Sequence, residues 1–140
     1  MRAVVQRVAR ASVSVDGAPV GQIGAGLLVL LGVAAGDDEA VADRFADKLL
    51  ALRVFEDSDG RMNVNVGDAG GAVMCVSNFT VYGDARGGNR PSFTEAALPE
   101  RAQGLYERVR ERLGAVGGVF GARMSVELEN DGPVTIVVEL

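Results

Sequence analysis

An Asp-Gly dipeptide between two extended runs constrains the fold of this chain more than any other feature. Polar and apolar residues alternate along 2–15, as in a strand with one buried face, and Asp16-Gly17 follows at once. Both turn residues tolerate positive φ, so the pair is typical of a tight hairpin. We therefore predict a long first strand, a return strand over 18–23 and, after a glycine-rich turn, a third strand over 27–33.

Two helices are predicted further along the chain. Asp37 or Asp38 can cap a helix in which apolar residues recur every three or four positions between Val41 and Leu52. Pro99 suits the first turn of a second helix with an apolar face of the same period.

The remaining segments are predicted to be strands and turns. We expect strands at 54–55, 72–76, 124–129 and 134–140, with turns at 57–60 and 130–133. With 140 residues the chain has the length of one domain. The order of elements predicts an α/β fold: a single compact domain over 1–140, with mixed, largely antiparallel sheet layers and two main helices packed on one side.

The composition excludes several kinds of catalysis. There is no histidine, so Ser-His-Asp and Cys-His mechanisms and histidine-ligated metals are ruled out. The single cysteine, Cys75, lies in the apolar run 72–76, and we interpret it as a core residue rather than a reactive thiol. No metal and no cofactor are expected.

Net charge and hydropathy limit which partners the protein can bind and where in the cell it is expected. A net charge of -5 argues against broad adhesion to nucleic acid, although a local patch of arginines suited to phosphate stays open. No apolar stretch is long enough for a membrane helix, and the first residues become polar too soon for a signal peptide. We expect no membrane association and a cytoplasmic location.

Two polar segments could carry chemistry. A bend at Ser77-Asn78-Phe79-Thr80 could present backbone N–H donors to an oxyanion, or its hydroxyls could satisfy only local backbone bonds. Gly132-Pro133 lies between two expected strands, where proline suits an edge, a bulge or a turn. Its peptide bond is of the kind that adopts cis at modest cost, and a simple turn is the alternative.

Five segments, in order along nearly the whole chain, carry a family resemblance. They are Met1–Val8, Ser77–Tyr82, Arg90–Phe93, Gly118–Ala122 and Asn130–Thr135. Together they resemble the D-aminoacyl-tRNA deacylase family. The resemblance implies hydrolysis of the ester that joins a D-amino acid, or glycine mischarged on tRNA-Ala, to the 3′-terminal adenosine of tRNA. It also implies a homodimer with two active sites at its interface.

The resemblance assigns roles to particular residues. Thr80 matches the family's active-site threonine and, with Ser77 and Phe79, the segment that holds the aminoacyl group. Gly132 and Pro133 match a Gly-cisPro element that enters the other subunit's site.

The other residues that match the family are assigned to substrate binding. Arg7 matches the arginine that helps fix the Gly-cisPro element, and Asn78 stands where the family usually has glutamine. The region around the terminal adenine is matched by Phe120, Gly121 and Met124. The stretch between Leu113 and Gly118 is shorter than is usual in the family.

The implied mechanism needs no acid–base side chain. It uses the 2′-hydroxyl of the substrate's own ribose, while the protein supplies position and N–H donors. An L side chain would collide with the carbonyls of the Gly-cisPro element, whereas a D side chain or glycine would pass.

Two other functions fit the composition. One is a non-catalytic, dimeric binding module for a nucleotide or a protein. The other is a serine or threonine hydrolase with Lys48 as the base.

Overall fold

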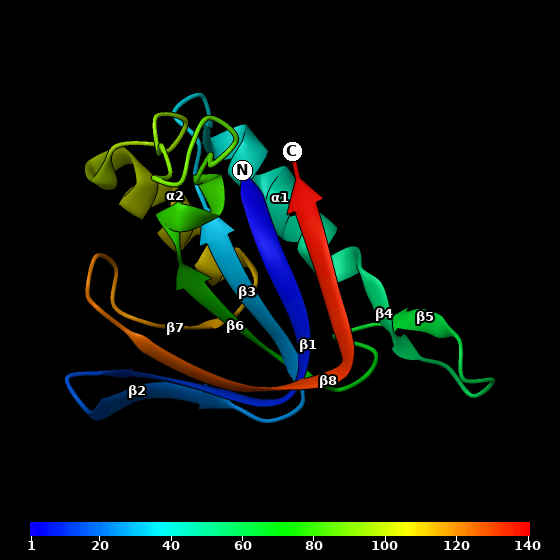
Figure 1. The fold of residues 1–140 in the computed structure, drawn as a ribbon. Coiled ribbons are helices and arrows are strands. Elements are labelled where there is room, and N and C mark those ends of the chain that lie inside the picture. The colour runs from blue at the N-terminus through cyan, green and yellow to red at the C-terminus, as the bar shows by residue number, and fades with distance from the viewer.

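A computed structural model describes all 140 residues and shows a mixed sheet with two helices (Figure 1). The elements are β1 (Arg2–Val15), β2 (Ala18–Ile23), β3 (Gly26–Gly32), α1 (Glu39–Ala51), β4 (Arg53–Glu56), β5 (Met62–Asn65), β6 (Ala72–Ser77), the 3-10 turn η1 (Phe79–Tyr82), α2 (Pro99–Arg112), β7 (Val116–Gly117) and β8 (Ser125–Glu139). The predicted fold class is confirmed.

Strand β1 is the centre of the sheet. One of its edges pairs with β3 and then with β2, and its other edge pairs with β8 along nearly its whole length, all antiparallel. The predicted hairpin is confirmed, with Asp16 and Gly17 at φ 49° and 78°. Beyond β3 the sheet continues with β6 and β7, both parallel to their neighbours.

The sheet curls until β2 comes back against β7. A Cβ on Gly21 of β2 would lie 2.5 Å from Val116 Cγ1 and 3.1 Å from the Gly117 carbonyl oxygen. Only glycine permits this close approach. The helices cover one face of the sheet, and the other face carries a second cluster of buried hydrophobic side chains that includes Val13, Leu28 and Met74.

Strand β8 differs from the prediction. Two strands separated by a turn at 130–133 were expected, but the structure has one strand over 125–139. In its pairing with β1, Gln6 lies opposite Thr135 and Val8 lies opposite Asn130. The residues 131–134 therefore stand opposite Arg7 alone, as a bulge. Polar turn residues indicated an interruption of the ladder, but they could not reveal that the same two strands resume pairing beyond it.

The helices begin where the caps predicted. The Asp38 carboxylate accepts a hydrogen bond from Val41 N at 2.9 Å, and Pro99 opens α2. Two bidentate ion pairs, Arg108 with Asp43 and Arg112 with Asp47, join α2 to α1.

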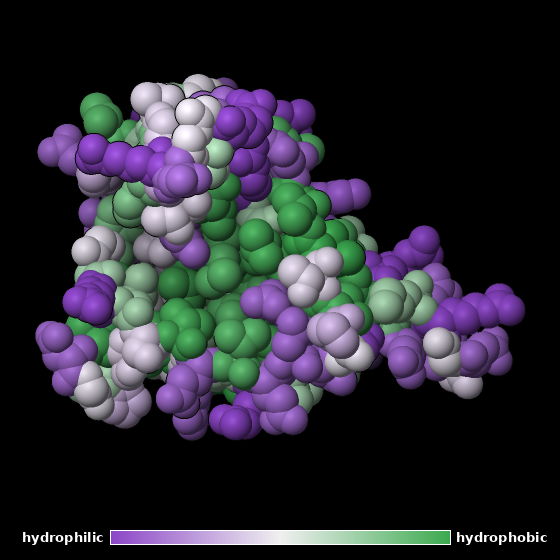
Figure 2. All heavy atoms as spheres, in the orientation of Figure 1, coloured by the Kyte–Doolittle hydropathy of each residue, from purple (hydrophilic) through white to green (hydrophobic).

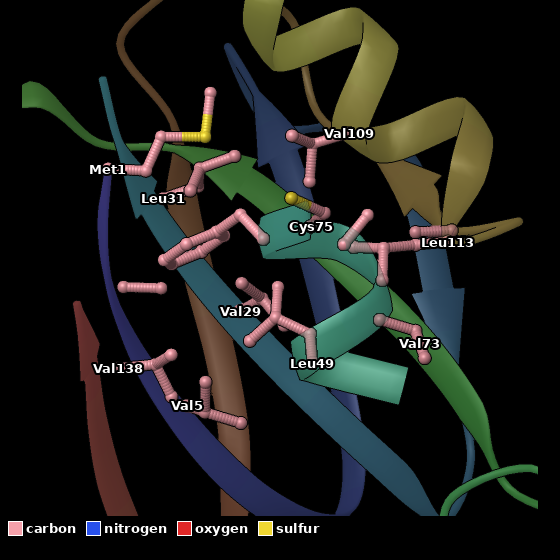
Figure 3. Close-up of a cluster of buried hydrophobic side chains, with 14 of the residues drawn as sticks. Met1, Val5, Val29, Leu31, Leu49, Val73, Cys75, Val109, Leu113 and Val138 are labelled. Carbon is pink, nitrogen blue, oxygen red and sulfur yellow. The ribbon is translucent and has the colours of Figure 1, made fainter. Parts of the chain in front are cut away.

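The main hydrophobic core lies between the helices and one face of the sheet (Figure 3). Met1, Val29 and Leu31 point into it from the strands, and Leu49 and Val109 from the helices. Cys75 is fully buried among these side chains, and burial raises the pKa of its thiol to about 12. Its interpretation as an inert core residue is confirmed.

The two ends of the chain lie side by side (Figure 1). The Met1 ammonium donates to Asp37 Oδ1 and to the Leu140 carbonyl, both at 2.8 Å, and is buried. The second oxygen of Asp37 accepts from Ala34 N at 2.7 Å, which holds the turn before α1. Neither helix of the chain is long and apolar enough to cross a bilayer.

Candidate active site

An apolar pocket of about 670 Å³ opens beside the end of β6. Its walls come from the ends of β3 and β6, from η1, from the segment 93–98, from α2, and from the loop before β8 with the start of that strand. It brings together six of the residues that the sequence marked as site residues: Ser77, Asn78, Phe79, Phe120, Gly121 and Met124. Segments far apart in the chain therefore meet at one cavity.

The chain leaves the sheet at Asn78 and turns into η1. Asn78 N donates to the Leu31 carbonyl at 2.8 Å, which is the last hydrogen bond of the pairing between β6 and β3. The backbone then bends, and η1 begins at Phe79. The N–H groups of Phe79 and Thr80 come first in this turn, where no preceding carbonyl is placed to accept them. Two backbone donors are thus left free next to the pocket.

Thr80 lies on the rim and not in the pocket wall. Its side chain is exposed, and Oγ1 donates to Asn78 Oδ1 at 2.5 Å. This contact links the threonine hydroxyl to the residue that differs from the family's glutamine.

Aromatic rings form two sides of the pocket. Phe79 and Phe93 meet edge to face with their centroids 5.1 Å apart, and Tyr106 and Phe120 lie 5.8 Å apart. The Tyr106 hydroxyl donates to the Cys75 carbonyl at 2.7 Å, and burial raises its pKa, so it is neutral. Phe93 had no role of its own in the sequence analysis, where it was only the last residue of the family-like segment Arg90–Phe93.

Arg2 holds η1 against β1. Its Nη1 donates to the Val81 carbonyl at 3.1 Å, and its guanidinium lies 4.5 Å from the centroid of the Tyr82 ring. Glu139 fixes the other side of the guanidinium through contacts at 2.7 and 3.1 Å. Sequence reasoning did not single out Arg2, because the contact joins residues about 80 positions apart.

Three of the expected site residues lie away from the pocket of their own chain. Gly132 and Pro133 are exposed at the β8 bulge, and the peptide bond between them is cis. Arg7 is buried beneath the bulge, where its Nη1 donates to the Val54 carbonyl at 2.7 Å and its Nε to the Asp131 carbonyl at 3.2 Å. Arg2 contacts η1 and Arg7 contacts the bulge. The two arginines are five residues apart on β1, so η1 and the bulge lie roughly 17 Å apart along this strand.

The pocket walls carry no charged side chain. Apart from backbone groups, their polar atoms belong to Ser77, Asn78 and Tyr106. Lys48 is exposed on α1, which contributes nothing to the pocket, so the hypothesis of Lys48 as a base is wrong. Chemistry here must depend on position, on N–H donors and on groups that the ligand brings.

Comparison with known proteins agrees with this architecture. A solved structure described as a "probable eukaryotic D-amino acid tRNA deacylase" superposes with a TM-score of 0.84 over 99% of this chain and 98% of that one, at 16% identity. At that identity the likeness shows the fold alone. The chain thus has the α/β architecture of an aminoacyl-tRNA deacylase.

Similarity in sequence shows the family of this chain as well as its fold. The family model for D-Tyr-tRNA(Tyr) deacylase matches residues 4–139. The D-aminoacyl-tRNA deacylase of Symbiobacterium thermophilum is 58% identical over 99% of this chain and 95% of its own length. A solved structure named "c-Myc DNA Unwinding Element Binding Protein" has a TM-score of 0.95 and 42% identity, covering 100% of this chain and 99% of that one. The chain belongs to the D-Tyr-tRNA(Tyr) deacylase family, a family of hydrolases.

Proposed function

We propose that this protein hydrolyses the ester bond of D-aminoacyl-tRNA and releases the free D-amino acid and tRNA. The observation that carries the proposal is an uncharged, aromatic-walled pocket with two free backbone N–H groups at its edge. Such a site can bind an ester and its developing oxyanion but offers no side-chain base. An aminoacyl-tRNA brings its own reactive hydroxyl, so the absence of a base is no obstacle.

In the proposed mechanism the 2′-hydroxyl of the terminal ribose assists the hydrolysis. The N–H groups of Phe79 and Thr80 stabilise the negative charge that develops on the carbonyl oxygen. Ser77 and the Thr80–Asn78 hydrogen bond position the aminoacyl group. The terminal adenine stacks near Phe120, with Gly121 and Met124 beside it, because this part of the pocket has an aromatic wall and an exposed backbone.

We propose that the active unit is a homodimer. On the sheet face opposite the helices, Val137, Val4 and Leu30 lie in register across β8, β1 and β3. Val137 is 64% exposed, and Leu30 also lines the pocket. Figure 2 shows hydrophobic residues gathered in a hollow on this face, over β1, β3 and β6. A contiguous apolar surface of this kind favours contact with a second protein surface.

A second copy would also complete the site. The β8 bulge lies about 17 Å along β1 from η1, so it cannot line the pocket of its own chain. In a twofold dimer the same patch faces itself, and the bulge of each chain can reach the pocket of the other. We propose that the carbonyls of Gly132 and Pro133 then exclude an L side chain, while glycine, including glycine mischarged on tRNA-Ala, passes.

The test is release of free amino acid from D-tyrosyl-tRNA and from L-tyrosyl-tRNA, with no metal or cofactor added. Turnover of the D form alone is expected. Thr80→Ala should retain more activity than Thr80→Pro, because proline removes a backbone donor while alanine removes only the hydroxyl. Equal losses in two folded variants would identify the hydroxyl, and not the N–H, as the group that acts.

A non-catalytic binding module is the second candidate. The name of the structure with 42% identity describes a DNA-binding protein, and the pocket holds no conventional catalytic group. If neither ester is hydrolysed above the buffer rate while an oligonucleotide binds, the binding module is correct and the deacylase is not. A cytoplasmic location is proposed on the substrate alone, because aminoacyl-tRNA is consumed there.

A further inference from the structure

A polar hollow lies next to the apolar pocket, in the loop that follows η1. It has a volume of about 470 Å³, and no hydrophobic side chain lines it. Its walls are Asp84, Gly87, Gly88, Asn89, Arg90 and Ser92. Phe93, the next residue of the chain, belongs to the wall of the apolar pocket. The linings of the two cavities therefore meet along the chain at Ser92 and Phe93.

The loop is folded tightly enough to keep the shape of the hollow. Asp84 and Ser92 exchange both backbone hydrogen bonds, at 2.8 and 2.9 Å. A Cβ placed on Gly83 would lie 3.0 Å from Phe93 Cε1 and 3.6 Å from Pro91 Cβ, so the end of the loop is packed onto η1.

One positive charge of the hollow has no partner. Arg86 forms a bidentate pair with Asp84 at 2.9 and 2.8 Å, and that hydrogen bonding holds the pKa of Asp84 well below its usual range. Arg90 is exposed and makes neither an ion pair nor a hydrogen bond. Asp84 and Arg86 compensate each other, Glu95 acts on Arg86 only at longer range, and Arg90 is the one arginine of the loop without an ion pair.

Backbone donors line the same hollow. The N–H groups of Gly87, Gly88 and Asn89 donate to no carbonyl or side-chain oxygen. Successive free N–H groups next to a guanidinium form a concave site for an anion, and phosphate suits the guanidinium geometry.

We propose that this hollow binds a backbone phosphate of single-stranded nucleic acid, with Arg90 as its cation. The proposal rests on the proposed function, because the terminal nucleoside would occupy the apolar pocket and the preceding phosphates would then pass the loop. It gives an acidic protein a local electrostatic contact with its substrate, without broad adhesion to nucleic acid.

The first measurement is binding of a labelled CCA ribonucleotide by fluorescence anisotropy between 50 and 200 mM salt. For Arg90→Gln we expect about a tenfold weaker Kd at low salt, the loss of one charge-assisted contact. The slope of log K against log salt should fall by about 0.7, the value for one phosphate on a single strand. Arg61→Gln is the control, because Arg61 also lacks an ion pair but lies at the β4–β5 hairpin, far from η1 in Figure 1.

The second measurement uses two esters, D-tyrosyl-tRNA and D-tyrosyl-adenosine, the latter without phosphate. Arg90→Gln should raise KM about tenfold for the tRNA ester only, with kcat unchanged. If Arg90→Gln matches Arg61→Gln in the binding assay, or slows both esters equally, the phosphate site is refuted. Arg90-dependent binding without hydrolysis of either ester would keep the phosphate site and refute the deacylase.

Discussion

Gly132 occupies a position that no other residue fits. Its φ is 124°, and an added Cβ would lie 2.8 Å from Val134 Cγ2 and 3.1 Å from Arg7 Nη2. A side chain here meets backbone strain and displaces the guanidinium that holds the bulge. The residue therefore connects the shape of the bulge to Arg7.

We predict that Gly132→Ala lowers the free energy of unfolding by about 1–3 kcal/mol, the usual cost of holding a residue other than glycine in an unfavourable backbone conformation. It should also lower the ratio of D-ester to L-ester hydrolysis, because we propose that the bulge in its native position is what excludes an L side chain. Urea unfolding and paired ester assays measure the two effects.

Gly17→Ala is the matched control for this prediction. Gly17 also has positive φ, 78°, but no atom lies within 4 Å of its added Cβ. Gly17→Ala should cost less stability and leave D/L discrimination unchanged. A loss of discrimination in both variants would show that the contact with Arg7 is irrelevant.

At the scale of elements, β1 positions η1 through one arginine. Arg2 donates to the Val81 carbonyl and packs on Tyr82, whose pKa burial raises to about 12. Arg2→Gln should lower kcat about tenfold while costing only about 1–2 kcal/mol of stability, because it removes the hydrogen bond to Val81, the cation–π contact and an exposed ion pair with Glu139 that contributes little. Arg10→Gln removes an exposed ion pair of the same strand, with Glu129 at 3.4 Å, and should change neither. Equal activity of the two variants would contradict a positioning role for Arg2.

The contact between α1 and α2 should make stability depend on pH. Hydrogen bonding to Arg108 and Arg112 lowers the pKa values of Asp43 and Asp47. A carboxyl whose pKa is depressed in the folded state contributes stability above its unfolded value of about 4 and loses that contribution as the pH falls further.

Urea unfolding at pH 6 and pH 3 tests this dependence. The double variant Arg108→Gln/Arg112→Gln should lose less stability on acidification than the wild type does, since its carboxyls have no depressed pKa to lose. Arg61→Gln, which removes no ion pair, should behave as the wild type. An identical fall in all three proteins would show that these pairs do not contribute.

Local signals predicted most of the elements. The Asp16-Gly17 hairpin and the cap at Asp38 depend on neighbours in sequence, and both were placed within a few residues. The short strands β5 and β7 were not predicted, because their four and two residues are too few for a periodic pattern.

The arrangement of the candidate site depends on contacts between segments that are far apart in the sequence. Motif resemblance indicated that Ser77–Thr80 and Phe120–Met124 belong to one site, and the cavity does contain residues of both. The family resemblance indicated that Arg7 contacts the bulge, but nothing in the sequence indicated that Arg2 fixes η1 or that the Val54 carbonyl is a second partner of Arg7. Hydrogen bonds of this kind follow from the register of β1, which sequence alone does not set.

At the scale of the whole molecule, the two parts that we propose to form one site lie at separate places in a chain. The pocket lies by η1, the bulge lies farther along β1, and an apolar sheet face lies between them. The proposed twofold dimer would bring the two parts together, because each chain would insert its bulge beside its partner's pocket.

Mixing two inactive variants tests the exchange directly. Thr80→Pro disables a pocket, and Gly132→Phe adds a bulky side chain to a bulge; circular dichroism first establishes that both fold. After equal amounts are mixed and allowed to re-form dimers, half of the dimers contain one intact pocket facing one intact bulge. D-tyrosyl-tRNA hydrolysis should then recover to about a quarter of the wild-type rate, as random pairing in a twofold dimer requires. Activity that stays at the sum of the two separate variants would contradict a site shared between two chains.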